Sequence, residues 1–226
     1  MLLSNTDYYI LILAALALSF IARALVQRKF ETYRQVPAPM TGAQAARQLL
    51  DEAGLYDVPI ECVSGRLSDH YDPQSRVLRL SPEVMNGANV SAVGIAAHEV
   101  GHALQQKDAY APLELRNASV RTVGIGSSAA WPLFLLGLVL NFQPLLWAGV
   151  ALYAAMALFA LITLPVEWNA SRRALNLLSD RLYFSGEEME GARKVLSAAA
   201  LTYVATALMA VLQFVRFFNA ANRRRR

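Results

Sequence analysis

The chain has 226 residues, of which 55% are hydrophobic and only 17% are charged. This composition excludes a disordered or low-complexity chain and favours membrane-spanning helices. The formal net charge is +4 and the last four residues are all arginine, so the rest of the chain is neutral and gives no basic surface for nucleic acid.

The first candidate membrane span lies between Asp7 and Arg23, because residues 8–22 carry no charge. A helix of about 20 apolar residues crosses a bilayer core, and an arginine in its last turn can extend its side chain to the interface. No Lys or Arg precedes this segment, so it lacks the basic start of a secretory signal. We therefore expect residues 1–26 to form an uncleaved N-terminal transmembrane helix.

The next segment, residues 27–121, is long enough for a small domain with a core of its own. After a proline-containing linker, Thr41 and Gln44 have the spacing of a capping box, which marks the start of a helix. Gly54 is expected to end that helix, because glycine readily adopts the left-handed conformation of a C-terminal cap.

Two strands and a short helix are predicted beyond Gly54. Residues 58–63 have the composition of a strand, and residues 76–80 alternate as an edge or half-buried strand does. Ser81 followed by Pro82 predicts the start of a short helix. Cys62 is expected to be a small core residue, and a single cysteine excludes an internal disulfide framework and zinc sites built from several thiolates.

The sharpest feature of the chain is the sequence HEVGH at residues 98–102, within an alanine-rich segment, 91–106, that is expected to be helical. Residues four apart lie on one face of a helix, so His98 and His102 can bind the same metal ion. Glu99 would lie beside that ion, where it could take a proton from zinc-bound water and pass it to a leaving amine. The alternative is two histidines that only pack on a helix face.

Residues 122–166 carry no charge, and a polar interruption lies near their middle, at residues 141–144. The length suits a helical hairpin whose two ends return to the same face of the membrane. Glu167 is the first charge after this segment. The hairpin would therefore return Glu167 to the face where the HEVGH helix also lies.

A catalytic zinc site normally has three protein ligands and one open position, so the two histidines need a further ligand. The third histidine, His70, lies upstream of the motif, and a downstream carboxylate is therefore expected. The candidates are Asp108, Glu114, Glu167, Asp180, Glu187, Glu188 and Glu190. The last three suit the first turn of a helix, where the helix dipole favours acidic residues. Asp108 and Glu114 are expected on the exit loop of the motif helix. Glu167 remains, either as a ligand or as an interfacial carboxylate that ends a span.

Residues 195–215 form a fourth uncharged segment, and their small and hydroxylated side chains suit a helix packed against other spans. Lys and Arg gather after the first span, before the second, and between the third and fourth, which predicts that this side is cytoplasmic. Four spans would leave the terminal arginines outside, against this charge rule. We expect a multi-pass protein of the cell membrane with its catalytic domain in the cytoplasm.

Four segments of the chain resemble the YugP-type membrane zinc metallopeptidases: DHYDP at 69–73, VLRLS at 77–81, AAHEVGHALQ at 96–105 and LPVEWNAS at 164–171. The resemblance covers nearly the whole chain. It implies a gluzincin-like site, similar in layout to the HtpX and CAAX prenyl protease families. The implied site holds one Zn²⁺, with His98, His102 and Glu167 as ligands and Glu99 as base.

The chain departs from these relatives at one position. They usually place an aspartate four residues after the ligand glutamate, where it orients a zinc-binding histidine. This chain has Ser171 there, and Asn169 or Ser171 is a candidate for the same role.

Three further features have a functional and a structural interpretation. His70 could donate a hydrogen bond to the oxyanion of the transition state, or could be a turn residue bonded to Asp69 or Asp72. By analogy with gluzincins, the strand at 76–80 could bind an extended peptide through backbone pairing. Arg172 and Arg173 could bind a substrate carboxylate, although a positively charged cytoplasmic flank also explains them.

The sequence therefore predicts a predominantly α-helical integral membrane protein with a small α+β gluzincin-like zinc metallopeptidase domain. The expected parts are a transmembrane helix at 1–26, the metallopeptidase domain at 27–121, a transmembrane hairpin at 122–166, a helix with the third ligand at 167–194, and a fourth transmembrane helix with the arginine tail at 195–226. The expected partners are a membrane-associated polypeptide substrate and the lipid bilayer, without nucleic acid. The alternatives are a noncatalytic zinc-binding membrane scaffold and a zinc hydrolase of nonpeptide amides.

Overall fold

The computed structural model describes residues 5–182 and 184–223, so arginines 224–226 of the predicted tail lie outside the described residues. The described chain is mostly helical and forms two compact units. The apolar unit takes its described residues from 1–21, 114–165 and 202–226. The mixed unit takes them from 22–113 and 166–201. The sequence-based division into five parts stays a prediction.

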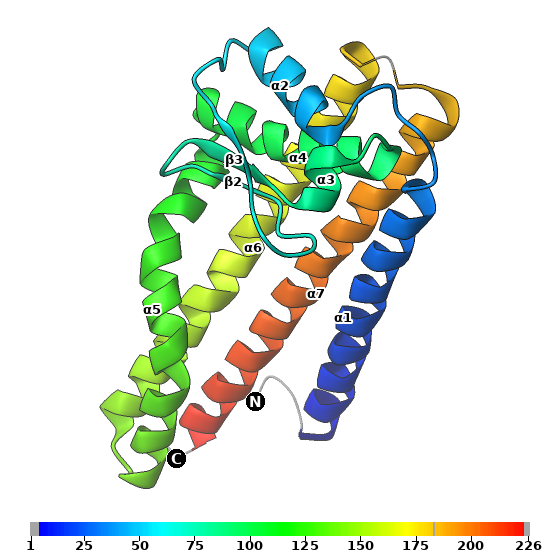
Figure 1. The fold of residues 1–226 in the computed structure, drawn as a ribbon. Coiled ribbons are helices and arrows are strands. Elements are labelled where there is room, and N and C mark those ends of the chain that lie inside the picture. The colour runs from blue at the N-terminus through cyan, green and yellow to red at the C-terminus, as the bar shows by residue number, and fades with distance from the viewer. Residues whose placement is uncertain (1–4, 183, 224–226) are drawn as a thin grey trace. The chain divides into compact units, whose positions relative to one another are not determined.

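Within the described residues, four helices are long and apolar enough to cross a membrane, and they indicate a membrane protein. They are α1 (Asn5–Tyr33), α5 (Ala111–Val139), α6 (Gln143–Asp180) and α7 (Gly186–Arg223) (Figure 1). Each contains the core of one predicted span. Helices α5 and α6 are joined at residues 140–142, which overlap the predicted polar interruption at 141–144.

Aromatic side chains form a cluster within the apolar unit. The Phe217 ring lies edge-on to Phe134, with ring centroids 4.4 Å apart, and stacks on Tyr153 at 4.1 Å. Such pairs add to the dispersion contacts between α5, α6 and α7, because this part of the chain packs largely through apolar and small side chains.

The mixed unit contains the helix predicted from the capping box. Helix α2 (Gly42–Glu52) starts at Thr41, whose hydroxyl accepts the Gln44 N–H at 3.2 Å, while the Gln44 side chain accepts the Thr41 N–H at 2.9 Å. Gly54 follows the helix with φ +72°, which confirms the predicted glycine cap. The inner face of α2 is fully buried at Leu49 and Leu50.

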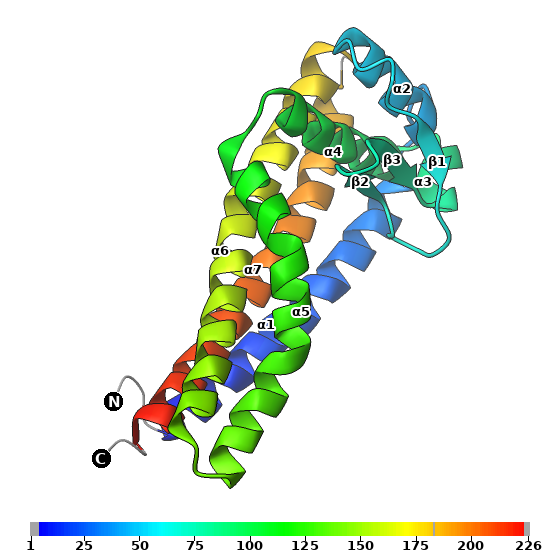
Figure 2. The same cartoon turned by 90° about the vertical axis from the view of Figure 1, so that its left-hand side faces the viewer.

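A three-stranded sheet follows, with the order β1-β3-β2 (Figure 2). Strand β3 (Val77–Leu80) pairs parallel with β1 (Ile60–Cys62) and antiparallel with β2 (His70–Asp72). Residues 76–80 are expected from the sequence to form an edge or half-buried strand; the central place of β3 excludes the edge alternative, and it also excludes the pairing of a peptide with this strand. Both hydrogen-bonding edges of β3 are already taken by its neighbours.

Two features of the sheet were not visible in the sequence pattern. Strand β2 is not predicted, because three residues are too few to show a period of two. Cys62 is exposed at the end of β1 and not in the core, which corrects the expectation for this residue. It lies on β1, an edge strand whose residues are exposed or only partly buried.

Helices α3 and α4 follow the sheet in the mixed unit. Helix α3 (Pro82–Asn86) starts after Ser81, as predicted. Helix α4 (Val90–Lys107) contains the HEVGH motif and is capped by Asn89, whose side chain accepts the Ala92 N–H at 3.0 Å. Most of α4 is buried, in a core that it shares with α2, β3 and the parts of α6 and α7 that belong to this unit.

Gly101 allows the motif helix to come unusually close to α6. A Cβ atom on Gly101 would lie only 2.7 Å from the carbonyl oxygen of Ala170, which is closer than real side chains approach. Because His98 and His102 flank Gly101 on α4, this close approach places them opposite residues 166–171 of α6. The glycine therefore positions the site described next.

Candidate metal centre

Three side chains from two helices of the mixed unit meet at one point. The carboxylate Oε2 of Glu167 on α6 lies 3.3 Å from Nε2 of His98 and 3.6 Å from Nε2 of His102. The potential ligand atoms of the three residues all lie within 4.8 Å of one another. The structure thus brings together the three residues that the sequence predicts as metal ligands.

The separations fit a tetrahedral metal ion. Ligand atoms that each lie about 2.0–2.2 Å from a tetrahedral zinc ion are about 3.4 Å apart. The two distances from Glu167 Oε2 to the imidazole nitrogens, 3.3 and 3.6 Å, agree with that spacing. Two imidazoles and one carboxylate also form a usual ligand set for catalytic zinc. The residues present therefore fit a zinc ion.

The electrostatics of the site favour a cation. Glu99 and Glu167 are both buried, and His102 lies beside them with 8% of its surface exposed. Burial alone would lower the pKa of His102, but its hydrogen bonds to Glu167 and Gln105 and the nearby charge of Glu99 outweigh burial and raise that pKa. Buried carboxylates need a compensating positive charge, and a divalent ion supplies one.

Each histidine has a partner for its second ring nitrogen. Nδ1 of His98 lies 3.2 Å from the Ser171 hydroxyl, and Nδ1 of His102 lies 3.0 Å from Oε1 of Gln105. Both Nε2 atoms therefore face Glu167 while both Nδ1 atoms are held from outside. Partners of this kind orient metal-binding imidazoles. Ser171, four residues after Glu167, contacts His98 directly.

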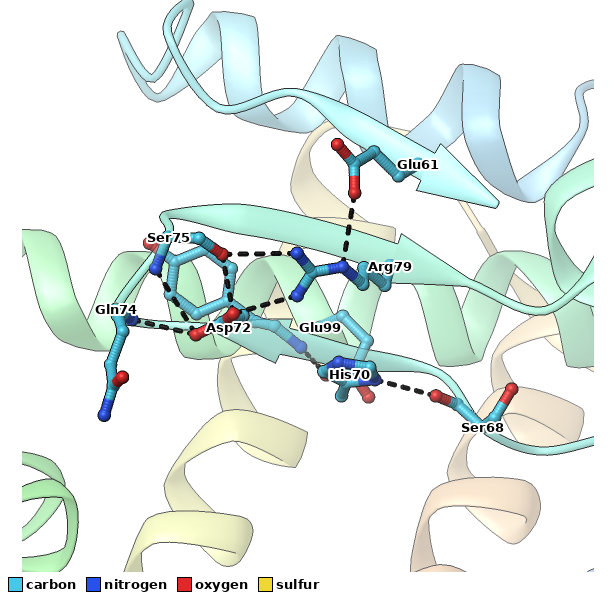
Figure 3. A network of polar contacts seen from close by, with 9 residues as sticks. Glu61, Ser68, His70, Asp72, Gln74, Ser75, Arg79 and Glu99 are labelled. Carbon is cyan, nitrogen blue, oxygen red and sulfur yellow. Dashed lines mark hydrogen bonds and ion pairs between the residues drawn. The ribbon is translucent and has the colours of Figure 1, made fainter. Parts of the chain in front are cut away.

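Glu99 is held beside the ligands by the edge strand of the sheet. Its Oε2 accepts the backbone N–H of Tyr71 on β2 at 2.9 Å. The Tyr71 hydroxyl donates to the Gln106 side chain at 2.7 Å, so β2 is anchored to α4 at two points. Figure 3 shows this contact between Glu99 and the backbone of β2. The sequence motif identifies Glu99 but gives no sign of Tyr71, which binds Glu99 through its backbone N–H.

His70 is an exposed residue of β2, and its Nδ1 lies 2.8 Å from the carbonyl oxygen of Ser68. It is therefore bonded to neither Asp69 nor Asp72, which corrects the structural alternative proposed from sequence. A carbonyl oxygen only accepts, so Nδ1 of His70 carries the hydrogen.

The two aspartates that flank His70 stabilise the local backbone. Asp69 accepts the Ser81 N–H at 2.7 Å and the Ser81 hydroxyl at 3.2 Å, and its burial raises its pKa. Asp72 accepts hydrogen bonds from Ser75 and Arg79, which hold its pKa well below the ordinary value (Figure 3). These contacts fix the loop before β2 and the turn after it.

The remaining acidic candidates have other places in the described chain. Asp108 ends α4 and pairs with Arg173, while Glu114 lies in the first turn of α5 and not on the exit loop. Glu187 and Glu188 occupy the first turn of α7, as predicted. Arg173 therefore has a structural partner in the protein.

Gln105 is a site residue that sequence reasoning missed. It is fully buried and contacts His102 from the same helix, three residues further along. Its spacing of three residues from His102 on the same helix is the signal that could have identified it, because a buried amide there requires hydrogen-bond partners.

A family whose description reads "Putative neutral zinc metallopeptidase" matches residues 8–222 of the chain. The chain is also 48% identical, over 212 residues, to the "Putative membrane protease YugP" of Bacillus subtilis (strain 168). That alignment covers 93% of this chain and 94% of the relative. No solved structure matches the chain.

Proposed function

Because this chain belongs to the family of neutral zinc metallopeptidases, we propose that it is a membrane-embedded peptidase that uses one zinc ion. His98, His102 and Glu167 bind the ion, and Glu99 is the general base. The observation that carries the proposal is the convergence of two imidazole Nε2 atoms on one carboxylate oxygen, at 3.3 and 3.6 Å, with the charge of Glu99 close enough to act on His102.

Each residue has a separate task in the reaction. Zinc, when bound, supplies Lewis-acid polarisation of the peptide carbonyl and acidifies a water molecule. Oε2 of Glu99 is held by the Tyr71 N–H, so Oε1 is the oxygen that we assign to accept the proton from the water. Glu99 then delivers that proton to the leaving amine, which completes hydrolysis.

His70 stabilises the oxyanion in this proposal. Its Nδ1–H donates to the Ser68 carbonyl, so the neutral ring can only accept at Nε2. Donation to an oxyanion therefore requires the imidazolium form. His70 adjoins Tyr71, whose backbone N–H binds Glu99, and this adjacency supports a role near the reacting carbonyl.

The site belongs to the gluzincin class in this proposal, because the third ligand is a glutamate downstream of the HEVGH helix. A membrane-associated polypeptide is the proposed substrate. Glu167 directly follows the uncharged segment 122–166, so the chain positions its reactive centre close to the end of a span.

The proposed topology is a multi-pass protein of the cell membrane with the mixed unit in the cytoplasm. Cys62 allows a direct test, because it is the only cysteine of the chain and is exposed. A membrane-impermeant maleimide should label it in permeabilised cells but not in intact cells, with Cys62→Ser as the unlabelled control. Equal labelling of intact cells would reverse the orientation.

The zinc ligands are tested by metal content and cleavage measured together. Glu167→Ala should lose bound zinc and peptidase activity, whereas Glu114→Ala should keep both. If Glu167→Ala retains a full equivalent of zinc, the assignment of the third ligand is wrong. The two alternatives are tested by the wild-type protein: a scaffold binds zinc without cleaving peptides, and a hydrolase of nonpeptide amides cleaves only those substrates.

A further inference from the structure

A continuous series of hydrogen bonds connects His102 to the surface of the mixed unit. Nδ1 of His102 lies 3.0 Å from Oε1 of Gln105, and Nε2 of Gln105 lies 3.0 Å from Oδ1 of Asn169. The same Oδ1 accepts the Nε–H of Arg173 at 2.8 Å, and Arg173 pairs with Asp108. The series joins the end of α4 to α6, from buried groups to an exposed carboxylate.

The direction of every bond in this series follows from the arginine. A guanidinium has only donors, so the atom of Asn169 that faces Arg173 is the carbonyl oxygen. That oxygen also faces Gln105, which must therefore present its NH₂ group.

The backbone supports the same orientation of Gln105. Its Nε2 also lies 2.8 Å from the carbonyl oxygen of Val166, which can only accept. With two acceptors in front of the nitrogen, the carbonyl oxygen of Gln105 is left to face His102. Gln105 is fully buried, so a reversed amide would place its oxygen against two other oxygens without water to relieve the repulsion.

We propose that Arg173, Asn169 and Gln105 are positioning residues that fix the tautomer of His102, with hydrogen on Nδ1 and the lone pair of Nε2 directed at the metal. The proposal rests on the zinc site of the proposed function. Because the amide oxygen of Gln105 accepts only from an N–H, Nδ1 of His102 keeps its hydrogen and Nε2 is the nitrogen left for the metal.

The contact that His98 makes with Ser171 does not fix the tautomer of His98, so the proposal concerns His102. Its Nδ1 contacts the Ser171 hydroxyl at 3.2 Å, and a hydroxyl can donate or accept. Ser171 therefore accommodates either tautomer of His98. Among the three proposed ligands, His102 is therefore the one whose tautomer is fixed by the hydrogen bonds that start at Arg173.

Two substitutions of Asn169 separate polarity from packing. Asn169→Leu has a similar shape but no acceptor, so Gln105 loses one of the two groups that orient it. Asn169→Asp keeps acceptor oxygens for both Gln105 and Arg173. We expect zinc affinity, measured by chelator competition on the full chain in detergent, to fall about 10- to 100-fold in Asn169→Leu and to be restored to within about threefold in Asn169→Asp.

The thermal midpoint of each zinc-free variant provides the control for folding. A folded Asn169→Leu protein with wild-type zinc affinity would overturn the proposal, and so would an equal loss of affinity in both variants. Glu167→Ala distinguishes the two levels of inference. If Glu167→Ala loses zinc while Asn169→Leu does not, only the role of the series is wrong. If neither variant loses zinc, the proposed site itself is wrong.

A spectroscopic measurement on the wild-type protein does not depend on how the variants fold. In the zinc-loaded chain with ¹⁵N-labelled histidine, His102 should show hydrogen on Nδ1 and metal coordination at Nε2. Coordination through Nδ1 would overturn the proposal.

Discussion

Replacing Gly101 by alanine should separate the two helices that carry the proposed zinc ligands. The new Cβ would lie 2.7 Å from the Ala170 carbonyl oxygen, whereas ordinary contact starts at 3.4 Å, so α4 and α6 must move apart by about 0.7 Å. Overpacking of this kind costs about 1–3 kcal/mol, and the gain in helix propensity offsets about 1 kcal/mol of it. We expect a net loss of stability of about 0–2 kcal/mol.

The effect on the site should be larger than the effect on stability. Metal–ligand distances are held within about 0.2 Å, so a shift of about 0.7 Å between α4 and α6 moves Glu167 out of reach of an ion bound by the two histidines. Misplacement by about 1 Å can cost on the order of 10²-fold in rate. We therefore expect kcat/KM to fall about 100-fold, with weaker zinc binding.

Gly94→Ala is the matched control on the same helix. A Cβ at Gly94 would meet the Cβ of Ala192 at 3.6 Å, which is ordinary contact. This variant should keep wild-type zinc affinity and activity and unfold at a slightly higher temperature. Zinc titration, peptide cleavage and thermal unfolding in detergent measure all three quantities. If Gly101→Ala binds zinc and cleaves peptide within twofold of wild type, the close contact of α4 with α6 does not position the site.

Four further predictions address single residues. Glu99→Gln should keep zinc but lower kcat by about 10²- to 10⁴-fold, and equal cleavage by both forms would remove its role as base. His70→Gln should lower kcat by about 10²-fold or more with little change in KM, so a change in KM alone would indicate only a binding role. Thr41→Ala should cost about 1 kcal/mol in chemical denaturation, because α2 loses its cap, and an unchanged midpoint would contradict this. Because the pKa of Asp72 is lowered on folding, its stabilisation is present above the unfolded pKa of about 4 and lost as pH falls through the folded value, so Asp72→Asn should lower the thermal midpoint at pH 7 more than at acidic pH.

The sequence by itself determined the features that depend on neighbouring residues. Uncharged runs long enough to cross a bilayer identified the cores of the four apolar helices, because hydropathy is a property of a continuous segment. The cap at Thr41 and the glycine at position 54 could also be predicted from the sequence, because the end of a helix depends on only a few neighbouring residues. The spacing of His98 and His102 placed two imidazoles on one face of α4 for the same reason.

Only the tertiary structure decided the contacts between distant segments. Glu167 lies 69 positions from His98 along the chain, and its carboxylate reaches the imidazole because Gly101 lets α6 approach α4. The edge strand β2, the exposure of Cys62 and the partners of both Nδ1 atoms depend on the same packing. Such contacts have no local signal, because the groups that satisfy a buried amide or imidazole are set by the helix packed against it.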